Sequence, residues 1–371
     1  WMPRIARLGY RDSIDEEVFH RCSVEALIQA EQQRQKQRQR QPETHRELRS
    51  RILSEVDVVA MTCAGAALRR FGFIHHTRNI GAMVIEEAAK VTQPCMLAML
   101  SYSPDRCIMI GDSMQLAPVV RSHFVRASTS LDLSLFERLQ RMGVPPVQLD
   151  HQGRARPEVC NLYRWRYRRL LDLDVAKAAS YRSASLMVAM DFIDVPNGRT
   201  DGEVCAEEGT SIATLVSMLV TEYGINIAKI SVLTPYRAQR RHLESALQHV
   251  PVGHIATIDE FQGLQNEVII ISLTHRGRRP SSFLCDPRRV NVLTSRAKHA
   301  VYFVGRRATY EADTDQWGRV LGVVAQYQGV VGVPAMKGWY DSLCKYGLCI
   351  RAEAAIATVA CAGSSENKIR I

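Results

Sequence analysis

The stretch Ala82-Met83-Val84-Ile85-Glu86-Glu87 joins a short apolar run to two adjacent carboxylates. A similar run before it, Val56–Met61, ends at Thr62, and one after it, Arg106–Ile110, ends at Gly111-Asp112. Residues 88–101 between the last two runs have a helical pattern. Short β-rich runs that alternate with helices are typical of a parallel sheet, and ligands of such sheets lie beyond the carboxyl ends of the strands. The sequence therefore predicts an α/β fold with its functional residues just after the strands.

A second set of such runs follows further along the chain. We predict strands at 190–194, 229–234, 254–258, 267–273 and 300–305, and helices at 211–223 and 238–248. Residues 291–298 are predicted to lead a helix into the last of these strands, and residues 13–51 to be helical. The predicted organisation is a helical, basic insertion at 1–55, the remainder of a first domain at 56–148, a second domain at 149–310, and a C-terminal extension and tail at 311–371.

Composition excludes several classes of protein. With 46% hydrophobic and 23% charged residues, the 371-residue chain is globular rather than disordered. No apolar run reaches the roughly 18 residues that span a membrane, and residues 1–4 do not begin a signal peptide. Ten cysteines without a Cys-x-x-Cys pair indicate an intracellular, reducing compartment, in which Cys95 and Cys107 are expected to be buried thiols.

Charge leaves two interpretations open. The formal net charge of +10 fits either a polyanionic partner or ordinary solubility. Residues 31–51, rich in Gln and Arg, fit a solvated helix better than an arm that touches nucleic acid. Further arginines follow between residues 154 and 169, where some of them are expected to face phosphate.

Two motifs after the first-domain strands suggest phosphate chemistry. Glu86-Glu87 could hold a hydrated Mg²⁺ and orient an attacking water, although glutamates are also favoured at helix N-termini. Gly111-Asp112-Ser113-Met114-Gln115-Leu116-Ala117-Pro118 places an amide where it could sense a phosphate, although a turn closed by Pro explains the same residues.

Three further motifs belong to the second block. Gln152-Gly153-Arg154-Ala155-Arg156-Pro157 offers arginines that could contact phosphate at the domain junction. Thr257–Gln265 follows a predicted strand, and Val290–Lys298 is expected to place Arg296 and Lys298 near the start of a helix. An arginine in that position suits the stabilisation of charge during phosphoryl transfer. Each motif alone could be a loop, but five in this order make that explanation improbable.

In this order the five motifs resemble those of superfamily 1 helicases, over about residues 56–305. Three more particular stretches resemble the aquarius-type members, the intron-binding RNA helicases of the spliceosome: Ala60–Leu68, Leu149–Arg156 and Cys160–Tyr167. The resemblance implies two RecA-like parallel-sheet domains, the first incomplete at its N-terminus. It also implies an ATP-dependent RNA helicase that acts in pre-mRNA splicing in the nucleus, with RNA and spliceosomal proteins as partners and no membrane.

The resemblance also assigns roles to individual residues. Catalysis would involve a general base, Glu87, a γ-phosphate sensor, Gln115, and two arginine fingers, Arg154 and Arg296. ATP and Mg²⁺ would be bound by Glu86, Asp112, Gln152, Gly263 and Gln265, with Glu86 holding the metal through water. RNA would be bound by Thr62, Cys63, Thr234, Tyr236 and Thr257.

The sequence departs from the family pattern at three places. Gly153 stands where relatives have a Tyr that stacks on adenine, and Glu86 where the metal ligand is usually Asp. No Gly-x-x-x-x-Gly-Lys-Thr/Ser occurs, so the phosphate-cradling loop is expected upstream of residue 1, and the chain is expected to be inactive alone. Two alternatives remain: a non-hydrolytic RNA-binding scaffold in a ribonucleoprotein, and an mRNA-decay or DNA-processing helicase of the same superfamily.

Overall fold

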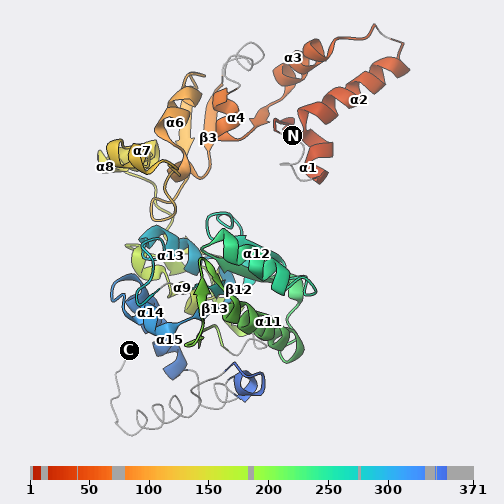
Figure 1. The fold of residues 1–371 in the computed structure, drawn as a ribbon. Helices are drawn as coiled ribbons and strands as arrows, with labels where there is room; N and C mark the ends of the chain where they lie inside the picture. The colour runs from red at the N-terminus through yellow and green to blue at the C-terminus, as the bar shows by residue number, and fades with distance from the viewer. Residues whose placement is uncertain are drawn as a thin grey trace. The chain divides into compact units, whose positions relative to one another are not determined.

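The computed structural model describes residues 3–9, 16–39, 41–68, 80–182, 188–274, 277–330, 339 and 341–348. The chain divides into two compact units, residues 1–146 (unit 1) and 147–371 (unit 2). The predicted tail after residue 351 lies outside the described residues. None of the described helices is long and apolar enough to cross a membrane. Figure 1 shows the elements of each unit along the chain.

Unit 1 contains two small parallel sheets, each with its own apolar core. The first pairs β1 (Ile5–Arg7) with β2 (Val58–Ala60), and it lies among helices α1 (Glu16–Cys22), α2 (Val24–Gln37) and α3 (His45–Glu55). The second pairs β3 (Ala82–Ile85) with β4 (Arg106–Met109), next to α4 (Cys63–Leu68) and α6 (Gln93–Leu100). The remaining elements of unit 1 are η2 (Ala88–Lys90), α7 (His123–Ser128) and α8 (Leu135–Arg141).

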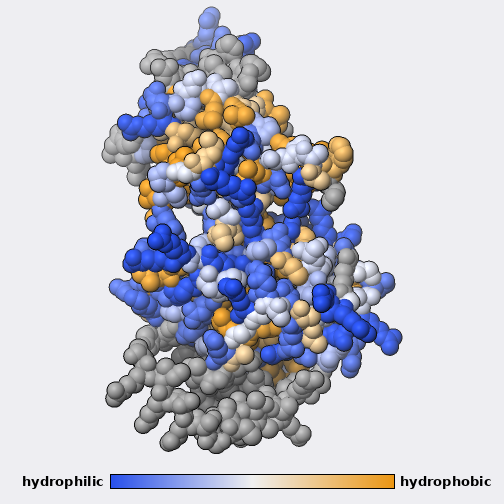
Figure 2. Space-filling model, turned by 90° about the vertical axis from the view of Figure 1, so that its left-hand side faces the viewer, coloured by the Kyte–Doolittle hydropathy of each residue, from blue (hydrophilic) through white to orange (hydrophobic). Residues whose placement is uncertain are grey.

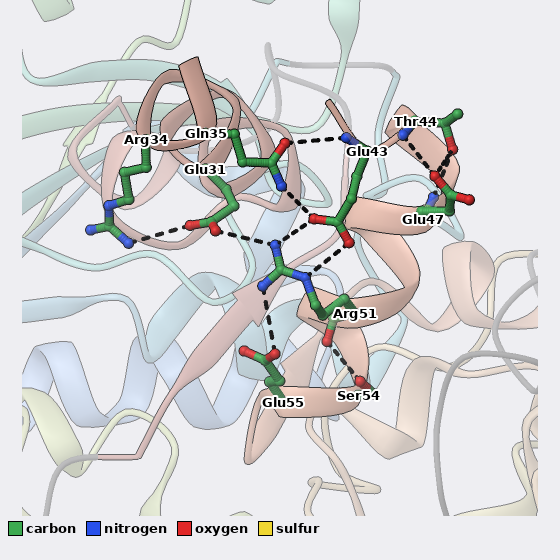
Figure 3. A network of polar contacts seen from close by, with 9 residues as sticks. All are labelled: Glu31, Arg34, Gln35, Glu43, Thr44, Glu47, Arg51, Ser54 and Glu55. Atoms are coloured by element: carbon green, nitrogen blue, oxygen red, sulfur yellow. Dashed lines mark hydrogen bonds and ion pairs between the residues drawn. The ribbon is translucent and has the colours of Figure 1, made fainter. Parts of the chain in front are cut away.

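The helical prediction for residues 13–51 is confirmed in part, because a break separates α2 from α3. Thr44 begins α3 through a capping box with Glu47, just after Pro42. Figure 3 shows how Arg51 joins the two helices: its guanidinium contacts Glu43 at 2.9 Å and Glu31 at 3.2 Å. Hydrogen bonding to Arg51 lowers the pKa of Glu43. Some charged side chains of this segment therefore form ion pairs with one another within a helical hairpin.

One face of the β3–β4 sheet is open in unit 1. Val84 and Ile108 are partners across the two strands, and their exposed fractions are 58% and 48%. Figure 2 shows apolar side chains gathered on the surface of unit 1. The expectation of a buried thiol at Cys107 is wrong, because Cys107 lies exposed on β4 at the edge of this two-stranded sheet; Cys95 is half-buried.

Unit 2 is a five-stranded parallel sheet in the order β11-β10-β12-β13-β7. The strands are β7 (Met190–Asp194), β10 (Ile230–Thr234), β11 (His254–Thr257), β12 (Asn266–Ser272) and β13 (Ala297–Gly305). They match the predicted runs closely. Strands that are buried on both faces have nearly continuous apolar sequences, which makes them easy to locate. The α/β fold class with parallel sheets is confirmed in both units.

Helices cover both faces of this sheet. On one face, α11 (Ala206–Thr221) and α12 (Arg237–Ala246) bury the main core with Trp339. On the other, Phe303 and Phe192 pack with Trp317 and Tyr310. The remaining elements of unit 2 are β5 (His151–Gln152), α9 (Pro157–Cys160), η3 (Arg164–Arg166), β6 (Leu171–Asp172), α10 (Asp174–Arg182), β8 (Thr200–Asp201), β9 (Val204–Cys205), η4 (Ile227–Lys229), α13 (Pro287–Thr294), α14 (Arg307–Glu311) and α15 (Gln316–Val330).

Candidate nucleotide and nucleic-acid sites

In unit 1, strand pairing brings together two motifs that lie 25 residues apart in the sequence. Ile85 is the partner of Met109, so Glu86-Glu87 and Gly111-Asp112 leave the sheet side by side. The Ala88 amide donates to the Ile110 carbonyl at 2.9 Å. A Cβ on Gly111 would come within 2.9 Å of the Ala89 nitrogen, so only glycine allows this close approach.

The side chains at this edge have distinct geometries. Glu86 and Glu87 are both exposed, and Glu87 has a left-handed backbone with φ 51°. The two oxygens of Asp112 are used inside the loop, because they accept from the Met114 amide and the Gln115 side-chain amide at 2.9 Å each. Asp112 therefore holds the Gln115 side chain within its own loop.

The edge of β3 and β4 fits a hydrated Mg²⁺ rather than a metal in a protein cage. Two exposed carboxylates supply the hard oxygen ligands that Mg²⁺ prefers. Within the described part of the chain, no group of three or more His, Cys, Asp and Glu side chains could hold a metal ion. A Mg²⁺ held here would keep several waters and take its remaining ligands from phosphates.

In unit 2, Arg154 reaches from its loop to a motif 141 residues further along the chain. Its Nη1 donates to the Ser295 carbonyl at 3.1 Å, and the residue is otherwise exposed. Gln152 shapes this loop, since its Oε1 accepts from the amides of Arg154 and Ala155 at 2.9 Å each. Its Nε2 donates to Asp172 at 2.6 Å. The polar groups of Gln152 are thus hydrogen-bonded to neighbouring residues, whereas most of the Arg154 side chain is accessible to solvent.

The expectation that Arg296 and Lys298 lie near the start of a helix is wrong. Asp286 and Pro287 begin α13 earlier in the chain, and the helix ends at Thr294, just before β13 begins at Ala297. Arg296 is therefore at the carboxyl end of a helix, where free carbonyls accept from a guanidinium. Its Nε donates to the Val292 carbonyl at 3.1 Å and its Nη2 to the Ser295 hydroxyl at 2.8 Å, and the residue is 1% exposed.

Gly263 and Gln265 belong to the loop that leads into β12, which starts beside Arg296. Gln265 is exposed directly before β12, and the amide of the next residue, Asn266, donates to the Arg296 carbonyl at 3.3 Å. Gly263 has φ +85°, which a residue with a side chain adopts at a cost. Arg154, Gln265 and Arg296 therefore gather at the amino edge of the sheet, where β12 and β13 begin.

The candidate RNA-binding residues of unit 2 lie at the opposite, carboxyl edge. Thr234 and Thr257 are partners at the ends of β10 and β11, and both are buried. Tyr236 follows Thr234, and its hydroxyl lies 2.8 Å from that of Ser281. Since β10 has five residues at about 3.3 Å each, the two edges are about 16 Å apart along the strand. Candidate functional residues of unit 2 thus flank the sheet at both edges, not only at the carboxyl edge.

The motif Thr257–Gln265 is held by an ion pair next to Thr257. The Glu260 carboxylate accepts from the Thr257 amide at 3.0 Å and from Arg240 at 2.9 Å. The hydrogen bond from the Thr257 amide is the largest cause of the lowered pKa of Glu260. These contacts fix the loop that joins the two edges.

In unit 1, Thr62 and Cys63 lie where β2 leads into α4. The Thr62 hydroxyl accepts from the Gly65 amide at 3.0 Å, as an N-terminal cap does. Burial raises the pKa of the Cys63 thiol. Both residues follow a strand, β2.

Sequence reasoning missed a cluster at the carboxyl edge of unit 2 that consists of Asp259, Phe283 and Arg289. The Arg289 guanidinium carbon lies 3.8 Å from the centre of the Phe283 ring, and Arg289 forms a 3.6 Å ion pair with Asp259. The Phe283 ring is 6.1 Å from that of Tyr236. Asp259 lies inside a motif, but no local pattern singles out Phe283 or Arg289.

Comparisons with known proteins identify the family of this chain. Two models described as AAA domain match residues 15–123 and 131–308. RNA helicase aquarius of Mus musculus is 31% identical over 288 residues, which cover 70% of this chain and 19% of that protein. The chain belongs to the superfamily 1 helicases. The resemblance to aquarius found in the motifs is thus confirmed over most of the chain.

Other helicases also match the chain. The Regulator of nonsense transcripts 1 homolog of Drosophila melanogaster is 30% identical over 300 residues, 74% of this chain and 24% of that protein. Helicase SEN1 of Saccharomyces cerevisiae is 28% identical over 71% of this chain and 13% of that protein. An arterivirus nonstructural protein 10 (helicase) structure matches with a TM-score of 0.41 at 15% identity, over 85% of this chain and 49% of that chain. The chain spans about a fifth of the length of the curated relatives it matches.

Proposed function

We propose that this chain is the greater part of the motor of an ATP-dependent RNA helicase that acts on introns in pre-mRNA splicing, in the nucleus and with spliceosomal proteins. The observation that carries the proposal is the hydrogen bond from Arg154 to the Ser295 carbonyl, next to Arg296. It unites two arginines from distant motifs at one edge of the unit 2 sheet. Paired guanidiniums suit charge that develops on transferring phosphate groups.

The residues of unit 1 suit the attack of water on a phosphate. Glu87 would accept the proton of the attacking water, and Gln115, held by Asp112, would sense the terminal phosphate. Glu86 would hold the metal through water. When bound, Mg²⁺ supplies positive charge that offsets the charge of the phosphates.

The residues of unit 2 suit nucleotide binding at one edge and RNA binding at the other. Arg154, Gln265 and Arg296 would contact the nucleotide, with Gly263 shaping their loop. Thr234, Tyr236 and Thr257, with Thr62 and Cys63 of unit 1, would contact the RNA backbone. Backbone contacts position a strand but carry little information about its sequence, so we expect low base specificity.

The test is the ATPase activity of the full-length protein with and without single-stranded RNA. Glu87→Gln keeps the size of the side chain but removes the base, so RNA-stimulated hydrolysis should fall by at least the roughly 10²-fold typical of a general base. RNA affinity, measured by fluorescence anisotropy, should stay within about twofold because Glu87 is not among the RNA-binding residues of our proposal. The control Glu311→Gln alters an exposed carboxylate paired to Arg307 within α14. Full ATPase activity in Glu87→Gln would refute the assignment.

A second candidate function is mRNA surveillance, because the Regulator of nonsense transcripts 1 homolog is 30% identical, close to the value for aquarius. Crosslinking of the protein in cells separates the two candidates: crosslinks to introns support splicing, and crosslinks confined to mature mRNA support surveillance. Wild-type protein that binds RNA but lacks ATPase activity would instead support a non-hydrolytic scaffold.

A further inference from the structure

Helix α13 connects the two edges of the unit 2 sheet. It begins after Asp286, near the carboxyl-edge cluster, and ends at Thr294, next to Arg296 at the amino edge. Its eight residues span about 12 Å at about 1.5 Å per residue. The residues Val290–Thr294 are buried, so the helix is fixed against the sheet along its second half. A displacement of one end is therefore expected to move the other.

At the first end, Arg289 connects three segments. Its Nη1 donates to Asp286 at 3.0 Å, which ties it to its own helix cap. Its guanidinium lies on the Phe283 ring, which packs against Tyr236. Its Nε faces Asp259 of the Thr257–Gln265 motif at 3.6 Å. The side chain is 21% exposed, so most of it is inside the cluster.

Arg289 and Asp259 are partly exposed, but the two atoms that face each other are shielded from water. The Arg289 Nε and the Asp259 Oδ1 are both inaccessible to water, and neither has a hydrogen-bond partner. At 3.6 Å they attract as ions but are too far apart for a hydrogen bond. A small movement of the loop or of α13 would convert this contact into a short, charge-assisted hydrogen bond, which is considerably stronger.

At the second end, α13 holds the two arginines. The Arg296 guanidinium is bonded to the Val292 carbonyl within the helix and to the Ser295 hydroxyl just after it. The carbonyl of Ser295 accepts from Arg154. The positions of both guanidiniums therefore depend on where the last turn of α13 lies.

We infer that Arg289 is a positioning residue that couples RNA binding at the carboxyl edge, through α13, to the placement of Arg154 and Arg296. This inference rests on the proposed function. RNA that contacts Tyr236 and Thr257 would shift Phe283 and Asp259, which both touch Arg289, and α13 would transmit the shift. Arg289 contacts neither nucleotide nor RNA in this account.

The test compares Arg289→Ala and Arg289→Lys with the control Arg307→Ala in the full-length protein. Arg307 is also an ion-paired arginine, bonded to Glu311 within α14, and shares none of these contacts. For Arg289→Ala we expect the ratio of RNA-stimulated to basal kcat to fall at least tenfold, while KM for ATP and Kd for single-stranded RNA stay within twofold. Arg289→Lys keeps the charge but loses the planar stack on Phe283, so it should restore part of the ratio.

Several outcomes would overturn the inference. An unchanged ratio in Arg289→Ala excludes coupling, and a Kd for RNA that rises as much as kcat falls makes Arg289 a binding residue instead. If Arg289→Ala does not fold, Arg289→Lys and Asp259→Asn are measured, and an unchanged ratio in both refutes the inference. Wild-type protein without RNA-stimulated ATPase activity would refute the proposed function itself, which is a different result from the loss of stimulation in a variant alone.

Discussion

Replacing Trp339 by Ala should strongly destabilise unit 2. Trp339 lies 107 residues beyond Val232, yet it is 1% exposed and belongs to the same apolar core. Its ring is stacked on Tyr302 at 5.1 Å with an interplanar angle of 17°, and it is 5.5 Å from Tyr223. Its Nε1 donates to the Asp191 carboxylate at 2.7 Å, inside the protein. Removal of the side chain thus affects both packing and a buried charge.

The structure allows the size of this effect to be worked out. Truncation of a buried Trp to Ala costs about 3–5 kcal/mol of unfolding free energy. Loss of the donor to the buried Asp191 carboxylate adds about 1–3 kcal/mol. With partial relaxation of the core, we expect a total of about 4–6 kcal/mol. In a domain of about 150–250 residues this lowers Tm by about 8–24 °C, since each kcal/mol shifts it by about 2–4 °C.

The assay is thermal and urea unfolding of residues 1–371, followed by circular dichroism. Trp339→Phe is the matched control, because it keeps an aromatic ring on Tyr302 but removes the donor to Asp191. It should cost only about 1–3 kcal/mol. A Tm for Trp339→Ala within about 2 °C of the wild-type value would show that Trp339 is not part of this core. Equal losses in both variants would show that the hydrogen bond, not the packing, dominates.

Three further substitutions test the charged groups of unit 2. Arg166→Met should leave Tm unchanged or raise it, because burial lowers the pKa of Arg166 to about 10 and its Nε and Nη2 have no hydrogen-bond partner. Arg164→Met is the contrasting variant. It breaks a 2.6 Å ion pair with Asp172 and should lower Tm. Glu260, whose pKa is lowered on folding, contributes stability above its unfolded pKa of about 4.3 and loses it as pH falls through the lowered value. The fall in Tm between pH 7 and pH 3, measured from melting curves, should therefore be smaller for Glu260→Gln than for the wild-type protein.

The strands and the order of the motifs were predictable from the sequence. β3 and β7 begin and end at the predicted residues, and the apolar run 82–85 ends abruptly at Glu86-Glu87. The superfamily was also readable, because five motifs in a fixed order constrain the family far more than any one of them. These properties are local in the chain, so local patterns of side chains are enough to determine them.

The tertiary structure alone decided which residues meet. The start of α13 at Asp286 and Pro287 moved Arg296 from the beginning of a helix to the end of one. The parallel order of β12 and β13 then placed it at the amino edge with Arg154, about one strand length from Thr234. The contact of Arg289 with Phe283 depends on how a loop folds over a helix, and side-chain packing between distant segments leaves no periodic trace in the sequence. That is why the sequence predicted the candidate site residues and their family, whereas the contacts at the two ends of α13 came from the tertiary structure.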